Sequence, residues 1–249
     1  MYNFQLKLEF PPDRDDTFEN FIQSPENRTC AALCHQFSTL QDAAPKGLVI
    51  HGPALCGKTH LLAAMGQVAS RSVGSASAVY LDCAQLAAEG RQKDMYGRLA
   101  EYVGAMERAV FLTVDRLEAA QDEEELCNLV FNLYNEVTGK PNGRFAAASA
   151  VSPPQWRFPD WLSTRLLWGH VAGLRPVGDE ARPQVLMKMA ADMRMVLPRE
   201  AALWLVTRLP RDPESQWQAL GRIDRLSLTK GRKISIPLIK EAVEQVDGQ

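Results

Sequence analysis

Several features that would narrow the class of function are missing from this sequence. No apolar run reaches the length of a membrane-spanning helix, and no apolar signal segment follows the N-terminus. The five cysteines are scattered without a CxxC pair, which argues against a zinc site and a disulfide framework. The net charge of -2 gives no support for a strongly basic nucleic-acid-binding surface. We therefore expect a cytoplasmic protein with no membrane partner.

What the sequence does contain is a phosphate-binding motif, GPALCGKTH, from Gly52 to His60. It fits G-x-x-x-x-G-K-[ST], follows the apolar run 47–50 directly and precedes a segment with helical periodicity. In this context the loop's backbone N–H groups point at phosphate oxygens, and the helix N-terminus adds positive potential. Lys58 is expected to reach the β- and γ-phosphates, and the Thr59 hydroxyl to ligate Mg²⁺. The motif predicts that the chain binds a nucleotide.

A second motif ends the apolar run 109–114 with an acid, Asp115. A buried strand of this kind delivers its last carboxylate to the phosphate site, where it can hold Mg²⁺ or its water. The alternative is a turn aspartate at the end of a strand, which the nearby phosphate motif disfavours. The expected nucleotide-binding residues are Gly52, Ala54, Cys56, Gly57, Lys58, Thr59, His60 and Asp115, with Thr59 and Asp115 as the Mg²⁺ ligands.

The order of apolar patterns predicts an α/β protein. Short apolar runs typical of buried strands alternate with helix-periodic segments, at 47–50, 78–82, 109–115 and 144–150. Such alternation favours an open parallel sheet that binds ligands at the carboxyl ends of its strands. Ser24, followed by Pro25, predicts the start of the first helix. After Pro176 only helical patterns remain, which predicts a small helical lid.

The first residues, QLKLEF at 5–10, leave two interpretations open. Alternation of Leu6, Leu8 and Phe10 is typical of an edge strand, but two prolines follow at once and argue against a sheet. An extended segment with apolar anchors also suits a groove on a partner protein. QLKLEF resembles the peptide by which bacterial proteins dock on the replicative sliding clamp. In that case Gln5 would bind a small polar pocket, and the three apolar side chains would fill an apolar one.

From Thr17 to about Val246 the chain resembles the AAA+ ATPases, and within them the DnaA branch. The resemblance rests on TFENF with Asn27, GKTHL, VDRLE, SPPQW and LSTRLLWG. It implies an N-terminal arm at 1–16, an AAA+ core with a parallel five-stranded sheet at 17–175, and an α-helical lid at 176–249. It also makes a homo-oligomer a reasonable expectation. The sequence ends at Gln249 without the basic helix-turn-helix domain of DnaA initiators, so we expect no direct sequence-specific DNA binding.

Together with the clamp-like peptide, these motifs resemble the Hda-type, DnaA-homologous regulators of chromosomal replication initiation. The resemblance implies a replisome-associated protein that binds the sliding clamp and DnaA and promotes hydrolysis of ATP held by DnaA. Arg165 matches the family's arginine finger, a guanidinium that stabilises transition-state charge across a subunit boundary and is worth about 10³ to 10⁵ in rate. A surface or interface salt bridge is the alternative role for Arg165.

Three departures from the family pattern concern hydrolysis. Arg116 replaces the second acid after Asp115, and a guanidinium cannot act as a general base at neutral pH. Glu214 aligns with the lid's sensor arginine, although Arg211 lies within one turn, and Val151 replaces the aspartate after the sensor strand. We therefore expect ADP or ATP with Mg²⁺ as a regulatory ligand, with ADP favoured, and weak or no intrinsic ATPase activity.

Two other classes of function remain open from the sequence. One is a stand-alone AAA+ ATPase or a DnaC-like helicase loader, although loaders normally carry an added N-terminal helicase-binding domain. The other is an adaptor that attaches a partner to the clamp without any catalytic effect. Replacement of Arg165 separates an activator from an adaptor, because only the activator would lose stimulated ATP hydrolysis.

Overall fold

The structure is a computed structural model that describes residues 16–39, 45–73, 78–90, 109–211 and 213–244. The expected clamp-binding peptide at 5–10 and a helical pattern at 93–106 lie outside these residues. The chain divides into two units, of which the second contains Ile22–Pro25 and the residues from Val177 onward. Each unit is described by itself. None of the described helices is both long and apolar enough to cross a membrane.

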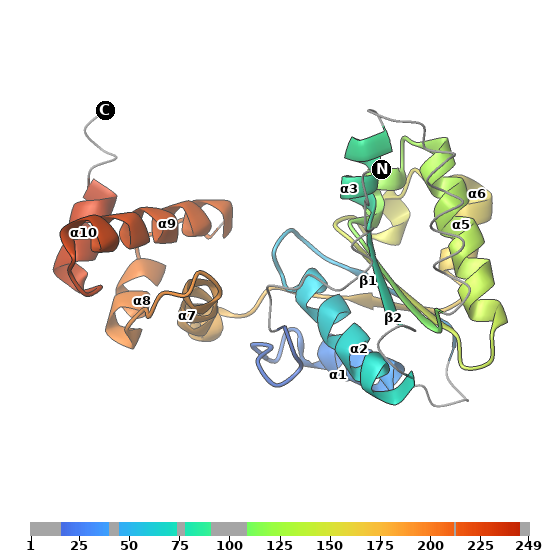
Figure 1. The fold of residues 1–249 in the computed structure, drawn as a ribbon, viewed down its shortest axis with the longest axis horizontal. Coiled ribbons are helices and arrows are strands. Elements are labelled where there is room, and N and C mark those ends of the chain that lie inside the picture. The colour runs from blue at the N-terminus through green and yellow to red at the C-terminus, as the bar shows by residue number, and fades with distance from the viewer. Residues whose placement is uncertain (1–15, 40–44, 74–77, 91–108, 212, 245–249) are drawn as a thin grey trace, which may run out of the picture. The chain divides into compact units, whose positions relative to one another are not determined.

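Five parallel strands in the order β2-β3-β4-β1-β5 form the sheet of the first unit (Figure 1). They are β1 (Gly47–His51), β2 (Ala78–Asp82), β3 (Phe111–Asp115), β4 (Arg144–Ser149) and β5 (His170–Gly173). The predicted five-stranded parallel sheet is confirmed. β3 and β4 are buried along their whole length, which explains their continuous apolar sequences. Because all strands run the same way, the residues that follow β1, β3 and β4 meet at one edge of the sheet.

Helices cover both faces of this sheet (Figure 1). Leu48 and Ile50 point to the face covered by α1 (Arg28–Ser38) and α2 (Lys58–Val73), whereas Val49 points to the other face. That other face is covered by α3 (Cys83–Gly90), α5 (Glu124–Gly139), α6 (Asp160–Leu166) and the 3-10 turn η2 (Leu117–Ala120). A further 3-10 turn, η3 (Pro153–Gln155), follows β4. The sequence alternation within β1 therefore separates two apolar cores.

Helix α1 begins later than the sequence predicts. Its N-cap is Asn27, whose carbonyl oxygen accepts the first intrahelical hydrogen bond from Ala31 at 3.0 Å. Residues 25–27 form a turn, so the prediction that Ser24 caps this helix is wrong. Asn27 is fully buried, and the packing of this turn outweighs the local preference for a serine cap.

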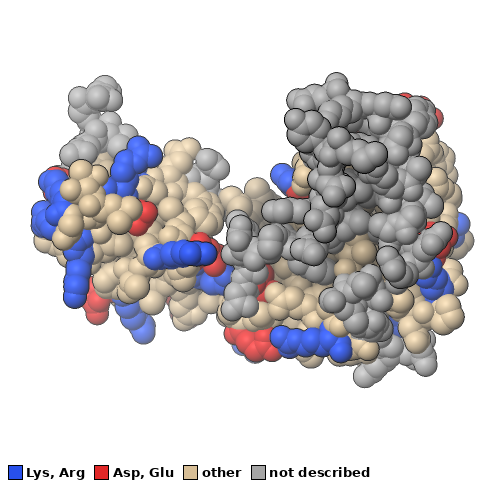
Figure 2. Space-filling model, viewed as in Figure 1, with Lys and Arg blue, Asp and Glu red and all other residues tan. Residues whose placement is uncertain are grey.

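The second unit is helical, as predicted. It contains η4 (Asp179–Ala181), α7 (Arg182–Asp192), α8 (Arg199–Val206), α9 (Pro213–Lys230) and α10 (Ile236–Glu244). Its own core includes Leu186, Leu205, Leu220 and Ile239, all 1% exposed or less. On the face shown in Figure 2, basic side chains gather on this unit with acidic ones between them. One such cluster pairs Glu241 with Lys230 and Arg232.

Candidate functional site

The predicted phosphate loop connects the end of β1 to the start of α2. Its first residue, Gly52, donates its backbone N–H to the Ser149 carbonyl oxygen at 3.1 Å, which ties the loop to the end of β4. A Cβ on Gly52 would lie 2.2 Å from the Leu174 carbonyl oxygen, so no larger residue fits there. Gly57 has a φ of 101° and would place a Cβ 2.7 Å from a ring carbon of Phe21. Both glycines of the motif are therefore required by the backbone path.

The Lys58 side chain lies along this loop and is buried. Its ammonium donates hydrogen bonds to the carbonyl oxygens of Gly52 at 2.8 Å and Pro53 at 2.7 Å. An ammonium group can donate three hydrogen bonds and carries a full charge, so the same group can serve a phosphate oxygen. The loop thus keeps its cation at the place where the motif requires it.

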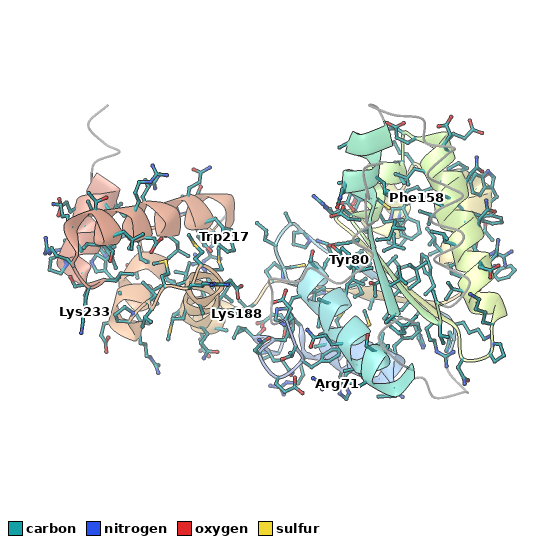
Figure 3. All side chains as sticks on the ribbon, in the orientation of Figure 1. Arg71, Tyr80, Phe158, Lys188, Trp217 and Lys233 are labelled. Atoms are coloured by element: carbon teal, nitrogen blue, oxygen red, sulfur yellow. The ribbon has the colours of Figure 1, made fainter. Side chains whose placement is uncertain are left out.

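Thr59 and Asp115 come together across the gap between α2 and β3. The Thr59 hydroxyl donates to Asp115 Oδ2 at 2.5 Å, and the Tyr80 hydroxyl donates to the same oxygen at 2.9 Å. Tyr80 comes from β2 (Figure 3), and Asp115 is only 2% exposed. A hydroxyl and a carboxylate are hard oxygen ligands, and Mg²⁺ in such sites keeps several waters in addition. The pair therefore fits an Mg²⁺ ion, although sequence reasoning missed the contribution of Tyr80.

Arg116 has a different role from the acid that it replaces. Its guanidinium makes a two-pronged ion pair with Asp82 at the end of β2, through Nε at 2.7 Å and through one terminal nitrogen. Asp82 also accepts the backbone N–H groups of Ala84 at 3.0 Å and Gln85 at 3.2 Å, which caps α3. Arg116 itself has a φ of 50°, in the left-handed region. The position of the second acid is thus occupied by a structural ion pair.

The acid two positions further along the chain is also engaged. Glu118 accepts the backbone N–H of Ala150 at 2.8 Å, just after β4. Ser149, the expected sensor, is fully buried, and its hydroxyl accepts the backbone N–H of Val151 at 3.2 Å. Sequence reasoning did not single out Asp82 or Glu118, although an acid at the end of β2 was a visible signal.

The remaining predicted loop residues have mixed surroundings. Ala54 is exposed, and burial raises the pKa of the Cys56 thiol. His60 lies within 3.1 Å of an Asp16 carboxylate oxygen through Nδ1 and within 2.8 Å of the Thr17 carbonyl oxygen through Nε2. These contacts attach the segment before α1 to helix α2.

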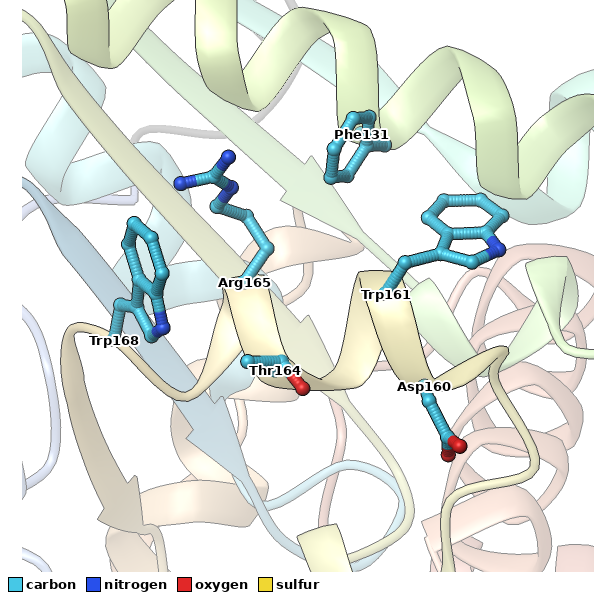
Figure 4. Close-up of a pocket in the computed structure, with 6 residues that line it drawn as sticks. All are labelled: Phe131, Asp160, Trp161, Thr164, Arg165 and Trp168. Carbon is cyan, nitrogen blue, oxygen red and sulfur yellow. The ribbon is translucent and has the colours of Figure 1, made fainter.

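Arg165 lies at the other edge of the sheet. It belongs to the last turn of α6, and its guanidinium lies over the rings of Trp168 at 4.1 Å, Phe131 at 5.5 Å and Tyr134 at 6.0 Å (Figure 4). The Tyr134 hydroxyl lies beside Gly47, the first residue of β1. The phosphate loop begins at the opposite end of β1, about 16 Å away along the strand. Arg165 is therefore separated from the phosphate loop of its own chain.

The lid residues predicted as sensor candidates have no clear counterpart. Arg211 donates to an Asp179 carboxylate oxygen at 2.9 Å, within the second unit. The side chain of Glu214 lies outside the described residues. Within the part of the chain that the structure describes, no group of three or more His, Cys, Asp or Glu residues could hold a metal ion.

Comparisons with known proteins agree with this architecture. The family model of the bacterial DnaA ATPase domain matches residues 13–173, and that of the Hda lid domain matches residues 179–243. Domain III of the replication initiation protein DnaA from Thermotoga maritima is similar, with a TM-score of 0.79 at 20% identity over 95% of this chain and 98% of that chain.

Two further structures are similar at lower identity. AMPPCP-bound DnaA from Aquifex aeolicus has a TM-score of 0.68 at 18% identity over 86% of this chain and 66% of that chain. The Holliday junction branch migration motor RuvB from Thermotoga maritima has a TM-score of 0.64 at 14% identity over 93% of this chain and 72% of that chain. These likenesses show the AAA+ fold.

Proposed function

We propose a function from one premise: the chain belongs to the bacterial DnaA family of ATPase domains, and its second unit matches the Hda lid domain. The chain is thus a relative of proteins that regulate replication initiation. Our proposal is that it holds an adenine nucleotide with Mg²⁺, hydrolyses it poorly, and docks on the sliding clamp. From there it offers Arg165 to ATP bound by DnaA and so promotes conversion of that ATP to ADP.

Nucleotide binding is supported by the geometry of the phosphate loop. Two glycines that tolerate no Cβ, a lysine folded along the loop and a paired threonine and aspartate are the parts that the P-loop chemistry needs. A DnaA relative of the same fold was crystallised with AMPPCP, an ATP analogue. We propose ADP as the working ligand, because tight retention of the product suits a site without its own hydrolytic groups.

The single observation that carries the proposal is the ion pair between Arg116 and Asp82. An acid after Asp115 would polarise the attacking water, but a guanidinium is protonated at every physiological pH and cannot accept that proton. The pair also engages Asp82, and Glu118 is engaged by the Ala150 backbone. The nearby acids therefore hold structure, and we infer that the site retains its nucleotide instead of turning it over.

Arg165 supports an action on a second protein. It lies at the sheet edge opposite to its own phosphate loop, in a shallow hollow of 430 Å³ whose rim includes the exposed side chains Trp161 and Trp168. A partner that docks on this surface can receive the guanidinium, whereas the chain's own nucleotide cannot. Clamp docking through Gln5, Leu6, Leu8 and Phe10 rests on the sequence pattern alone.

The test is the hydrolysis of radiolabelled ATP preloaded on DnaA, with clamps loaded on DNA and increasing amounts of this protein. We expect the parent to accelerate hydrolysis and Arg165→Ala to lose about 10³-fold of that acceleration. Arg71→Ala is the matched control, because Arg71 is an exposed arginine at the far end of α2 (Figure 3).

Clamp docking is tested in the same reaction with the Gln5→Ala, Leu8→Ala double variant. The variant should lose clamp binding in a pull-down and lose stimulation together. If Arg165→Ala stimulates hydrolysis as well as the parent does, the protein is an adaptor and the activator proposal is wrong. If the double variant binds the clamp normally, only the docking part of the proposal fails.

A further inference from the structure

The surroundings of Arg165 differ from those of most arginines in this protein. Ion pairs with carboxylates hold Arg116, Arg157, Arg182, Arg211 and Arg232. Within the described part of the chain, Arg165 makes no such pair and instead contacts three aromatic rings. Asp160 lines the same hollow but points away from the guanidinium (Figure 4).

This difference has a direct electrostatic consequence. A carboxylate would neutralise the guanidinium and occupy its N–H donors, so that a phosphate would have to displace it. The face of an aromatic ring attracts the cation without neutralising it, and it leaves the in-plane N–H groups available. Arg165 is therefore held in place while its charge and donors remain free for a polyanion.

Trp168 is the ring that lies closest to the guanidinium, at 4.1 Å from its centroid. Its backbone is fixed, because its N–H donates to the Arg165 carbonyl oxygen at 3.3 Å. The next residue, Gly169, packs so closely on Gly47 that a Cβ there would lie 2.1 Å from the Gly47 carbonyl oxygen. The tryptophan side chain is nevertheless 66% exposed, so its ring is not retained to fill the core.

We propose that Trp168 is the positioning residue for Arg165: its ring holds the guanidinium by a cation–π contact in an un-neutralised state, oriented to meet the phosphate of a nucleotide bound by a partner. This inference rests on the proposed function and adds the residue that sets the geometry of the arginine. Phe131 and Tyr134 complete the support from α5. The site is thus specific for a polyphosphate that the partner presents.

The experiment is a titration of this protein against DnaA preloaded with labelled ATP, which separates the maximal rate of stimulated hydrolysis from the half-saturating concentration. We expect Trp168→Ala to lower the maximal rate about tenfold, the scale of a lost cation–π contact. The half-saturating concentration should change less than about threefold. Trp168→Phe should restore most of the rate, because phenylalanine also presents a ring face.

Trp161→Ala is the matched control, because Trp161 borders the same hollow but packs edge-on against Phe131 at 5.1 Å. It should leave the maximal rate within about twofold of the parent. The Arg165→Ala, Trp168→Ala double variant should be no slower than Arg165→Ala alone, since the tryptophan acts through the arginine.

The outcomes separate this inference from the function on which it rests. If Arg165→Ala is slow but Trp168→Ala keeps the maximal rate, only the positioning role is wrong. If Trp168→Ala changes the half-saturating concentration alone, the tryptophan is a docking contact and the inference is overturned. If Arg165→Ala itself keeps full stimulation, the proposed function fails, and the positioning role fails with it.

Discussion

The two edges of the sheet use arginine in opposite ways. At the carboxyl edge, beside the phosphate loop, Arg116 is neutralised by Asp82 and contributes to structure. At the amino edge, Arg165 rests on aromatic rings without a carboxylate among the described residues. The comparison teaches that the partner of a cation, more than its exposure, indicates whether its charge is available to a ligand.

The largest expected effect comes from a change that keeps the charge at the amino edge. Arg165→Lys should lose about 100-fold of the stimulated hydrolysis of DnaA-bound ATP, because an ammonium lacks the planar fork that stacks on Trp168 and binds phosphate at two points. Single-turnover hydrolysis measures this loss. Near-normal stimulation by the lysine variant would show that charge alone suffices and that ring stacking has no role.

At the carboxyl edge, the phosphate grip itself should be the most sensitive feature. Lys58→Ala removes a buried cation whose charge-assisted hydrogen bonds are each worth about 1.5 to 3 kcal/mol, so ADP affinity should fall about 100-fold. Calorimetric titration with ADP and Mg²⁺ measures it. Lys240→Ala, at an exposed position of α10, is the control, and an equal loss there would point to general damage.

The structural role of the Arg116 pair predicts an asymmetry between its two partners. Asp82→Ala loses the α3 cap as well as the ion pair and should lower the free energy of unfolding by about 2 kcal/mol. Arg116→Ala should cost less than about 1 kcal/mol, because the arginine is 52% exposed. Urea denaturation of both variants measures the difference. Equal costs would mean that the cap contributes nothing.

The smallest effect is expected from the phenol that contacts the Mg²⁺ ligand pair. Tyr80→Phe removes one hydrogen bond to Asp115 and keeps the ring, so Mg²⁺-dependent ADP affinity should fall about threefold to tenfold. ADP affinity measured without Mg²⁺ serves as the control and should not change. A loss of the same size without Mg²⁺ would assign Tyr80 to the fold of β2 instead.

The comparison also explains what the sequence could predict. The strands and the loop of Gly52, Lys58 and Thr59 follow from local patterns, because buried strands need apolar runs and a phosphate loop needs glycines at set positions. The meeting of Thr59 with Asp115 follows from parallel topology, since both lie at the carboxyl edge. Local patterns therefore suffice where a motif carries its own geometry.

Contacts between distant segments were beyond such reasoning. The ion pair of Arg116 with Asp82 joins residues from β2 and from the end of β3, and nothing local in either segment specifies it. The start of α1 was predicted wrongly at Ser24, because burial of Asn27 depends on the rest of the fold. The clamp-binding peptide and the action of Arg165 on DnaA stay predictions.

The most direct measurement follows two nucleotides in one reaction. DnaA is preloaded with ATP carrying one isotope at the α-phosphate, this protein is preloaded with ATP carrying another, and both labels are followed from ATP to ADP on clamp-loaded DNA. The account predicts that the label on DnaA is converted, that this conversion requires Arg165, and that the label on this protein stays as ATP. Rapid conversion of this protein's own label, with that on DnaA unchanged, would contradict it.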